Sequence, residues 1–307
     1  MKKIIEQLRN ADIGVVLVDE PLSNHTTWRI GGPADLMLIP KSKEALIQCM
    51  KIVYEHRVPW TVIGRGSNLL VRDGGIRGVV FKIGVGLDHI HFDGHEVYAE
   101  AGFSFIKLAV LAGKEGLSGL EFAGGIPGSV GGALFMNAGA HGSEVARILK
   151  FVEVLHEVGT LVTLTPEEMK FSYRKSILQG QKSIVTSARF QLERGDRKAI
   201  SEALAIHKDR RRQTQPLQLP CAGSVFRNPL PQYAGQLIES LGLKGHRIGG
   251  AEISNLHANF IVNVNNAKAK DVLNLIEMVR EKVKNEYNIQ IIPEVEVIGE
   301  EREELLK

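Results

Sequence analysis

Hydrophobic periodicity predicts helices that alternate with short strands over the first two thirds of the chain. Between residues 43 and 56, apolar side chains recur every three or four positions, which predicts an amphipathic helix. Ser104 precedes a second helical pattern that runs to residue 114, and a third spans 196–213. Runs rich in β-branched and aromatic residues predict strands at 60–64, 78–83, 95–102, 149–156, 160–165 and 183–192.

The pattern changes after residue 213. The stretch TQPLQLP (214–220) has the composition of a linker. Beyond it the periodicity predicts a helix at 233–241, a strand at 259–264, a helix at 267–286 and a strand at 294–298. We therefore expect two domains, residues 1–213 and 214–307.

Composition narrows the classes of function. The chain has 307 residues, 44% of them hydrophobic and 24% charged, with a formal net charge of +3. This charge is too small to indicate a nucleic-acid binder, but it suits an anionic small ligand. Cys49 and Cys221 are the two cysteines, so no disulfide framework and no cysteine metal site are expected. The ten histidines show no metal-ligand spacing, so no metal is expected.

No apolar stretch is long enough for a membrane span, and the first residues do not resemble a signal peptide. We expect a cytoplasmic protein with no membrane partner, no nucleic-acid partner and no obligate protein partner.

Two glycine-rich segments are candidates for holding phosphate. They are VIGRGSNLLV (62–71) and GGIPGSVGGALFMNAGA (124–140). Successive backbone N–H groups can form a concave anion site without a lysine. Neither segment has the spacing of a dinucleotide fingerprint or of a Walker loop. The alternative is that these glycines only permit tight turns of the chain.

Seven segments, in order from about residue 20 to residue 299, resemble the UDP-N-acetylenolpyruvoylglucosamine reductase family. They are NHTTWRIGGPADLML (24–38), VIGRGSNLLV (62–71), GLEFAGGIPGSVGGALFMNAGAHG (119–142), FSYRKSIL (171–178), AGSVFRNP (222–229), AGQLIESLGLKGHRIGGAEISNLHANFIVN (234–263) and PEVEVIG (293–299). The resemblance implies an α+β chain. Residues 1–213 would form a two-subdomain FAD-binding fold of the vanillyl-alcohol-oxidase/PCMH type, and residues 214–307 a C-terminal α+β substrate domain.

The resemblance also implies how FAD is held, namely by main-chain amides along both glycine-rich segments. Glycine suits such a path because a Cβ would hold the backbone away from the phosphate oxygens. Ser67, Asn68 and Ser129 would add side-chain hydrogen bonds, and Asn137 would reach the ribose or the flavin; the alternative for each is an ordinary turn cap. The implied cofactor residues are Gly64, Arg65, Gly66, Ser67, Asn68, Leu69, Gly124, Gly125, Ile126, Pro127, Gly128, Ser129, Gly131, Gly132, Asn137, Ala138 and Gly139.

The activity that the resemblance implies is NADPH-dependent reduction, through FAD, of UDP-N-acetylglucosamine enolpyruvate to UDP-N-acetylmuramate in peptidoglycan synthesis. Arg174 matches the arginine that the family places at the substrate carboxylate. A guanidinium suits this role because it pairs with a carboxylate in two bonds. Glu294 matches the acidic residue that helps to stabilise the enolic intermediate. Ser224 matches the proton donor. Without the resemblance these residues read as a surface ion pair, a strand-edge charge and a turn residue.

Residues implied at the nucleotide sugar are Tyr173, Asn228, Gln236, Glu239 and His257; the alternative for Tyr173 is packing in the core. The basic run KDRRRQ (208–213) meets a diphosphate or the NADPH phosphate, or is the solvated end of a helix. After the Tyr-Arg motif the chain runs almost directly into the next strand, through SILQGQKSIVTSARF. It therefore resembles the shorter branch of the family, which lacks the insertion that carries a lid tyrosine. The alternatives are a flavin oxidase with another substrate and a non-catalytic nucleotide-sugar binding protein.

Overall fold

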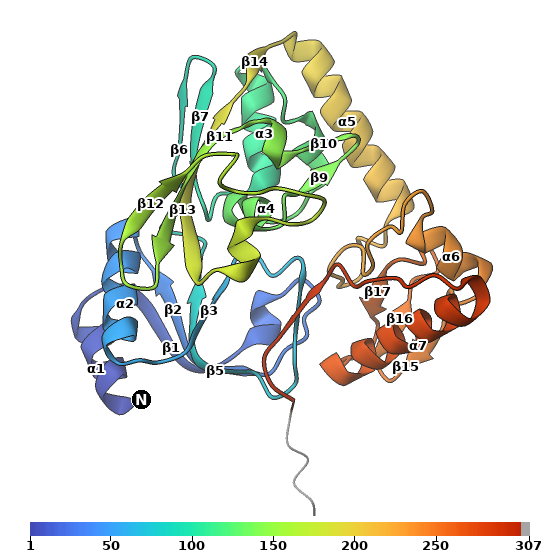
Figure 1. Cartoon of the computed structure of the whole chain (residues 1–307), viewed down its shortest axis with the longest axis horizontal. Coiled ribbons are helices and arrows are strands. Elements are labelled where there is room, and N and C mark those ends of the chain that lie inside the picture. The colour runs from blue at the N-terminus through green and yellow to red at the C-terminus, as the bar shows by residue number, and fades with distance from the viewer. Residues whose placement is uncertain (302–307) are drawn as a thin grey trace, which may run out of the picture. The chain divides into compact units, whose positions relative to one another are not determined.

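In the computed structural model, which describes residues 1–301, the chain divides into two compact units (Figure 1). Unit 1 consists of Met1–Val18, Leu36–Arg65 and Gly78–Arg211. Unit 2 consists of Asp19–Asp35, Gly66–Arg77 and 212–301. Each unit therefore draws on three stretches of sequence, and the division near residue 211 falls inside a helix. The proposed domain boundary at 213/214 stays a prediction.

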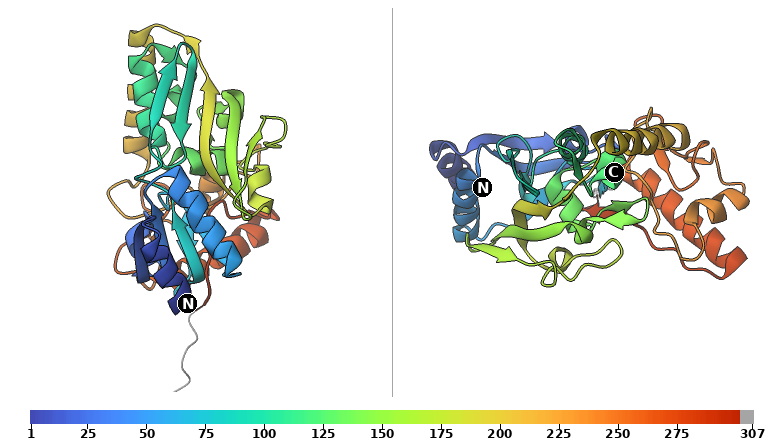
Figure 2. Two further views of the ribbon diagram at one scale, coloured as in Figure 1. Left: turned by 90° about the vertical axis from the view of Figure 1, so that its left-hand side faces the viewer. Right: turned by 90° about the horizontal axis from the view of Figure 1, so that it is seen from above.

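The first sheet of unit 1 has the strand order β1-β2-β5-β3. Its strands are β1 (Gly14–Pro21), β2 (Pro33–Pro40), β3 (Trp60–Ile63) and β5 (Ile76–Lys82). β3 and β5 are parallel, with Ile63 opposite Lys82. Helices α1 (Lys2–Asn10) and α2 (Lys43–Glu55) pack against each other, as Figure 2 shows. The hydrophobic pattern had predicted α2 and β3 but not α1, β1 or β2.

Sequence-local signals explain α2. The Ser42 side chain accepts a hydrogen bond from the Ala45 amide at 3.1 Å and so caps the first turn. The apolar face predicted for this helix is buried, from Ala45 and Leu46 to Val53. The prediction for residues 43–56 is thus confirmed to within one residue.

The second sheet of unit 1 is antiparallel, with the order β12-β11-β13-β7-β6. The predicted strands at 95–102, 149–156, 160–165 and 183–192 are confirmed as members of it. Its strands are β6 (Ile90–Asp93), β7 (Glu96–Glu100), β11 (Leu149–His156), β12 (Leu161–Leu164) and β13 (Ser183–Gln191). Shorter ladders are formed by β8 (Leu117–Ser118) with β14 (Glu193–Arg194), and by β9 (Gly139–Ala140) with β10 (Ser143–Glu144).

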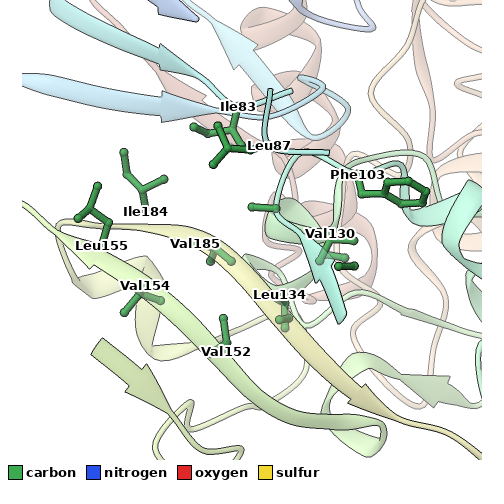
Figure 3. Close-up of a cluster of buried hydrophobic side chains, with 14 of the residues drawn as sticks. Ile83, Leu87, Phe103, Val130, Leu134, Val152, Val154, Leu155, Ile184 and Val185 are labelled. Atoms are coloured by element: carbon green, nitrogen blue, oxygen red, sulfur yellow. The ribbon is translucent and has the colours of Figure 1, made fainter. Parts of the chain in front are cut away.

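Three further helices belong to this part of the chain: α3 (Phe105–Lys114), α4 (Val130–Phe135) and α5 (Arg197–Thr214). α3 and α5 were predicted, and Ser104 caps α3 as expected. α4 was not predicted; it lies inside the glycine-rich segment and packs on β13 and β7. Figure 3 shows Val130 and Leu134 of α4 among the buried side chains of β11 and β13. A glycine-rich sequence becomes helical here because Val130 and Leu134 are buried in the core.

Unit 2 contains a three-stranded antiparallel sheet and two helices. The sheet is β15 (Arg247–Ile248), β16 (Ala251–Ile253) and β17 (Ile261–Asn263), and the helices are α6 (Ala234–Ser240) and α7 (Ala269–Tyr287). α7 packs on β15 and β16. A separate parallel pair joins β4 (Leu69–Val71) to β18 (Glu296–Ile298). The helices and strands predicted after residue 233 are confirmed, with each end within two residues of its predicted position.

Long-range hydrogen bonds tie the separate stretches of unit 2 together. The buried indole of Trp28 donates to the Ile261 carbonyl at 2.8 Å. Both oxygens of Asp73 accept amide hydrogen bonds at the first turn of α7, from Ala269 at 2.9 Å and from Lys270 at 3.0 Å. A side chain almost 200 residues earlier therefore supplies the N-terminal cap of this helix. Within residues 1–301, no helix is long and apolar enough to cross a membrane.

Candidate functional site

Tyr173 and Arg174 form the tip of a tight turn in unit 1. The amide of Ser172 donates to the Lys175 carbonyl at 3.1 Å, and the amide of Lys175 donates back at 3.0 Å. Arg174 has a left-handed backbone, with φ of +57°. Its Nη2 donates to the Gly139 carbonyl at 2.9 Å, and its guanidinium carbon lies 4.9 Å from the centre of the Tyr173 ring. Tyr173, predicted for the substrate, thus lies against the guanidinium of Arg174, predicted for catalysis.

The fully buried Asn137 holds the Arg174 turn in place through hydrogen bonds. The Asn137 side chain donates to the Ser172 carbonyl at 3.1 Å and accepts from the Ala146 amide at 3.1 Å. Gln179 also donates, to the Arg174 carbonyl at 3.1 Å. The amide of Asn137 therefore positions the turn, and its predicted contact with ribose or flavin stays a prediction.

Segments from both glycine-rich stretches meet in unit 1 at Gly64 and Ser129. A Cβ on Gly64 would lie 2.7 Å from the hydroxyl oxygen of the buried Ser129, so a larger residue directly after β3 would require this hydroxyl to move. Ser129 is 2% exposed and accepts a hydrogen bond from the Gly132 amide at 3.3 Å. Among the described residues, the backbone N–H groups of Gly128 and Ser129 have no acceptor. Donors of this kind suit a phosphate.

Other glycines of the second segment have a packing role. A Cβ on Gly124 would lie 2.5 Å from a methyl of Leu204 in α5, and one on Gly131 would lie 3.1 Å from Ala101. At Gly139 the nearest atoms, at 2.7 Å, belong to Ser143 and Glu144. Close packing favours glycine at these positions, and the alternative that the glycines only permit tight turns stays open. Cofactor contacts at these three glycines stay predictions.

The basic run at 208–213 forms the last turns of α5 and is mostly exposed. The carbon chain of Arg211 lies against Gly125. One turn earlier, the ring of His207 stacks on His141 with centroids 3.7 Å apart. Burial lowers the pKa of His141, and the charges of His207 and Arg210 lower it further. The choice between phosphate binding and a solvated helix end stays open.

In unit 2, the segment around Ser224 is fixed from both sides. On one side, the Glu294 amide donates to the Val225 carbonyl at 2.7 Å and the Arg227 amide donates to the Ile292 carbonyl at 2.9 Å. On the other side, Asn259 accepts from the Phe226 amide and donates to the Phe226 carbonyl, both at 2.9 Å. Its own carbonyl accepts from the Val225 amide at 2.8 Å.

The hydroxyl of Ser224 itself has no hydrogen-bond partner within residues 1–301. A Cβ on the preceding Gly223 would meet no atom within 4 Å, so the backbone is accessible there. A half-buried hydroxyl on a segment fixed at both edges is suited to donating a proton to a ligand.

Asn68, predicted for the cofactor, lies beside the predicted catalytic residue Glu294. Its side chain donates to the Glu294 carbonyl at 3.0 Å, and its own carbonyl accepts from the Glu296 amide at 2.9 Å. The parallel pairing of β4 with β18 continues this contact. Three motifs far apart in sequence, at residues 68, 224 and 294, are therefore brought together.

Four of the five residues predicted for the substrate cluster around α6. Asn228 accepts from the Ala234 amide at 3.1 Å at the start of the helix. Gln236 and Glu239 lie on α6, and Glu239 pairs with Lys244. His257 packs against Gly235, and its Nδ1 accepts from the Asn259 amide at 3.2 Å. Burial lowers the pKa of His257, so its neutral ring carries the proton on Nε2.

Sequence reasoning missed Asn259 and Lys82. Asn259 lies in a quoted motif, but nothing in its neighbours indicates that its amide reaches Phe226. Lys82 ends β5, where strand periodicity gives it no special weight; its ammonium donates to the Gly64 carbonyl at 2.6 Å. Only the parallel register of β3 and β5 brings Lys82 and Gly64 together. In the described chain, no group of three or more possible metal ligands occurs.

The residues of unit 1 fit FAD on the evidence of this geometry. The two glycine-rich segments bring together a glycine whose Cβ would crowd Ser129, two backbone donors without acceptors, a serine hydroxyl and the Lys82 ammonium group. Backbone and side-chain donors in this arrangement suit a dinucleotide pyrophosphate.

Two protein families match the chain. The family described as an FAD binding domain matches residues 34–165. The family described as the C-terminal domain of UDP-N-acetylenolpyruvoylglucosamine reductase matches residues 215–298.

Individual proteins match over nearly the whole chain. A UDP-N-acetylenolpyruvoylglucosamine reductase from Bacillus velezensis is 54% identical over 98% of this chain and 100% of its own length. One from Bacillus licheniformis is 55% identical with the same coverage. The crystal structure of the enzyme from Thermus caldophilus matches with a TM-score of 0.79 and 38% identity, covering 93% of this chain and 98% of that chain.

Proposed function

The chain belongs to the UDP-N-acetylenolpyruvoylglucosamine reductase family, and from this membership we propose how its residues divide the work of the reduction. It is an FAD-dependent oxidoreductase of peptidoglycan synthesis that reduces the enolpyruvyl group of its nucleotide-sugar substrate, with NADPH as the reductant. Bound FAD supplies the hydride that the enolpyruvyl double bond accepts. The two alternatives, an oxidase with another substrate and a non-catalytic binding protein, have no comparable support.

Ser224 donates the proton that completes the reduction. The observation that supports this role is its unpartnered hydroxyl on a segment held by Asn259 and Glu294. Hydride adds to the terminal carbon of the double bond, and the electron pair moves toward the substrate carboxylate. The adjacent carbon then takes the proton: the Ser224 O–H bond breaks, a C–H bond forms, and solvent reprotonates the serine oxygen.

Arg174 and Glu294 stabilise the charge that develops on the substrate carboxylate. The Arg174 guanidinium pairs with that carboxylate, because it stays charged and its planar fork matches two oxygens. The support is the position of the guanidinium in its turn. It donates to the Gly139 carbonyl and lies against the Tyr173 ring. Glu294, whose amide holds the segment around Ser224, is the acidic residue that helps to stabilise the enolic intermediate.

The polar residues around α6 bind the nucleotide sugar. Asn228, Gln236 and Glu239 lie on or beside this helix, and His257 presents an N–H donor next to it. These groups suit the hydroxyl and diphosphate oxygens of such a substrate. The enzyme acts in the cytoplasm without an obligate protein partner, where nucleotide sugars and NADPH are both found; cell fractionation with an antibody to the chain tests this location.

The experiment for Ser224 separates the two halves of the reaction. Flavin reduction by NADPH requires no proton at the substrate carbon, whereas reoxidation by the enolpyruvyl sugar does. We expect Ser224→Ala to leave the first half-reaction near the wild-type rate and to slow the second by about 10²–10⁴-fold. Ser224→Cys should recover part of the rate, since a thiol also donates a proton.

The measurement is anaerobic stopped-flow absorbance of the flavin, first with NADPH and then with substrate. Ser201→Ala, an exposed hydroxyl on α5, is the matched control and should behave as wild type in both halves. Equal slowing of both halves would assign Ser224 to positioning, and no slowing of either would show that another group supplies the proton.

A further inference from the structure

Lys82 ends β5 beside the first glycine-rich segment. It lies opposite Ile63 in the parallel pairing of β3 and β5, and Ile63 is the residue that precedes Gly64. Its Nζ donates to the Gly64 carbonyl at 2.6 Å, and the side chain is only partly exposed. Gly64 in turn lies against Ser129, whose hydroxyl oxygen would be 2.7 Å from a Cβ on Gly64. The ammonium is thus held at the meeting point of the two glycine-rich segments.

In the part of the chain that the structure describes, no negative charge balances this ammonium. Within residues 1–301, Lys82 pairs with no carboxylate, and β3 and α4 contain no charged residue. Asp35 on the neighbouring strand β2 pairs with Arg77 instead. Burial lowers the pKa of the Lys82 ammonium to about 8, and the positive charge of Arg65 contributes to this lowering. Burying a cation beside another cation is unfavourable unless an anion compensates it.

We propose that the Lys82 ammonium pairs with a phosphate of bound FAD and is the cation that neutralises the FAD pyrophosphate in this chain. The pyrophosphate is the anion that belongs in this part of the protein, because residues 34–165 match the FAD-binding domain family. The diphosphate of the nucleotide sugar is the competing anion, and the family for that part of the reductase matches residues 215–298. The hydrogen bond to Gly64 aims the ammonium at the same turn whose backbone binds the cofactor.

This pairing makes FAD affinity depend on pH. A phosphate next to Lys82 raises the pKa of the ammonium again, so binding takes up a proton where the free protein has lost it. The stabilisation is complete below pH 8 and decreases as the pH rises above it. The dissociation constant of FAD should therefore increase about tenfold between pH 7 and pH 9.

Lys82→Gln is the decisive variant, because glutamine keeps an N–H donor for the Gly64 carbonyl but has no charge. We expect the dissociation constant of FAD at pH 7 to rise at least about tenfold and its change between pH 7 and pH 9 to disappear. Lys82→Arg retains the charge and should bind FAD nearly as wild type at both pH values. Lys114→Met, an exposed lysine in the last turn of α3, is the control and should change neither quantity.

The measurement is the recovery of flavin fluorescence when each purified holoenzyme is diluted at pH 7, 8 and 9. Wild-type affinity in Lys82→Gln would overturn the proposal, because the lysine would then act only as a hydrogen-bond donor to the turn. Unchanged FAD affinity with a raised KM for NADPH or for the nucleotide sugar would also overturn it. If Lys82→Gln does not fold, the wild-type profile decides, and an FAD affinity that is constant from pH 7 to pH 9 refutes the proposal.

Discussion

Replacing Asn259 by alanine should show whether the segment around Ser224 must be held rigidly. Asn259 is 4% exposed, and its amide forms two hydrogen bonds of 2.9 Å with the backbone of Phe226, one in each direction. Alanine keeps the backbone bond from the Val225 amide but removes both side-chain bonds. The Phe226 amide and carbonyl would then remain buried without partners.

The cost follows from these two groups. A buried polar group left without a hydrogen bond costs about 1–3 kcal/mol, so two cost about 2–6 kcal/mol. A water molecule in the space left by the amide would satisfy part of this, which favours the lower half of that range. The segment can also relax away from Asn259, and a donor displaced by about 1 Å costs on the order of 10²-fold in rate. We therefore expect slower flavin reoxidation by substrate, with flavin reduction by NADPH unchanged.

Asn263→Ala is the matched control. Asn263 also makes two side-chain hydrogen bonds with backbone groups of unit 2, to Trp28 at 3.1 Å and from Ala267 at 2.9 Å, but it does not touch the Ser224 segment. Urea unfolding, followed by fluorescence of the buried Trp28 in a Trp60→Phe background, measures the stability of unit 2. Stopped-flow measurements of both half-reactions give the rates.

Both variants should be destabilised, but only Asn259→Ala should lose reoxidation rate. A wild-type reoxidation rate in Asn259→Ala would refute the reasoning. So would an equal loss in Asn263→Ala, because general loosening of unit 2 would then be the cause. In a Ser224→Ala background the Asn259 change should add little further slowing, since the proton donor is already absent.

Three more outcomes follow from the geometry. Arg174→Lys should lower kcat by more than about tenfold while changing substrate affinity much less, since the lost fork matters most in the transition state; steady-state kinetics measure both. Burial raises the pKa of Glu153, but hydrogen bonds from Thr186 and Lys43 outweigh burial, so the pKa is lowered. Glu153→Gln should therefore cost about 1–3 kcal/mol of unfolding free energy at pH 7. Urea titrations should show this difference shrinking as the pH falls below about 4. Asp73→Ala removes both of its hydrogen bonds to the first turn of α7 and should cost about 1–2 kcal/mol by the same titration, with Asp93→Ala at the exposed end of β6 near zero.

The sequence by itself determined the elements whose signals are local. Helix α2 follows from its apolar spacing and the cap at Ser42, and β11 follows from its β-branched run. The motifs around Arg174, Ser224 and Glu294 identified the family and the FAD-binding fold because they are contiguous in the chain. The strand β1 escaped prediction because none of its residues is buried, which leaves only a weak apolar pattern. β2 escaped as well, although most of its residues are buried.

Only the tertiary structure decided what each residue of those motifs touches. Gly124 and Gly131 share one glycine-rich segment with Gly128, yet their missing side chains face Leu204 and Ala101. Asn259 reaches Phe226, 33 residues away, and Lys82 reaches Gly64 through the register of two parallel strands. Such contacts depend on which segments the packed core brings together, and neither spacing nor composition along the chain contains that information.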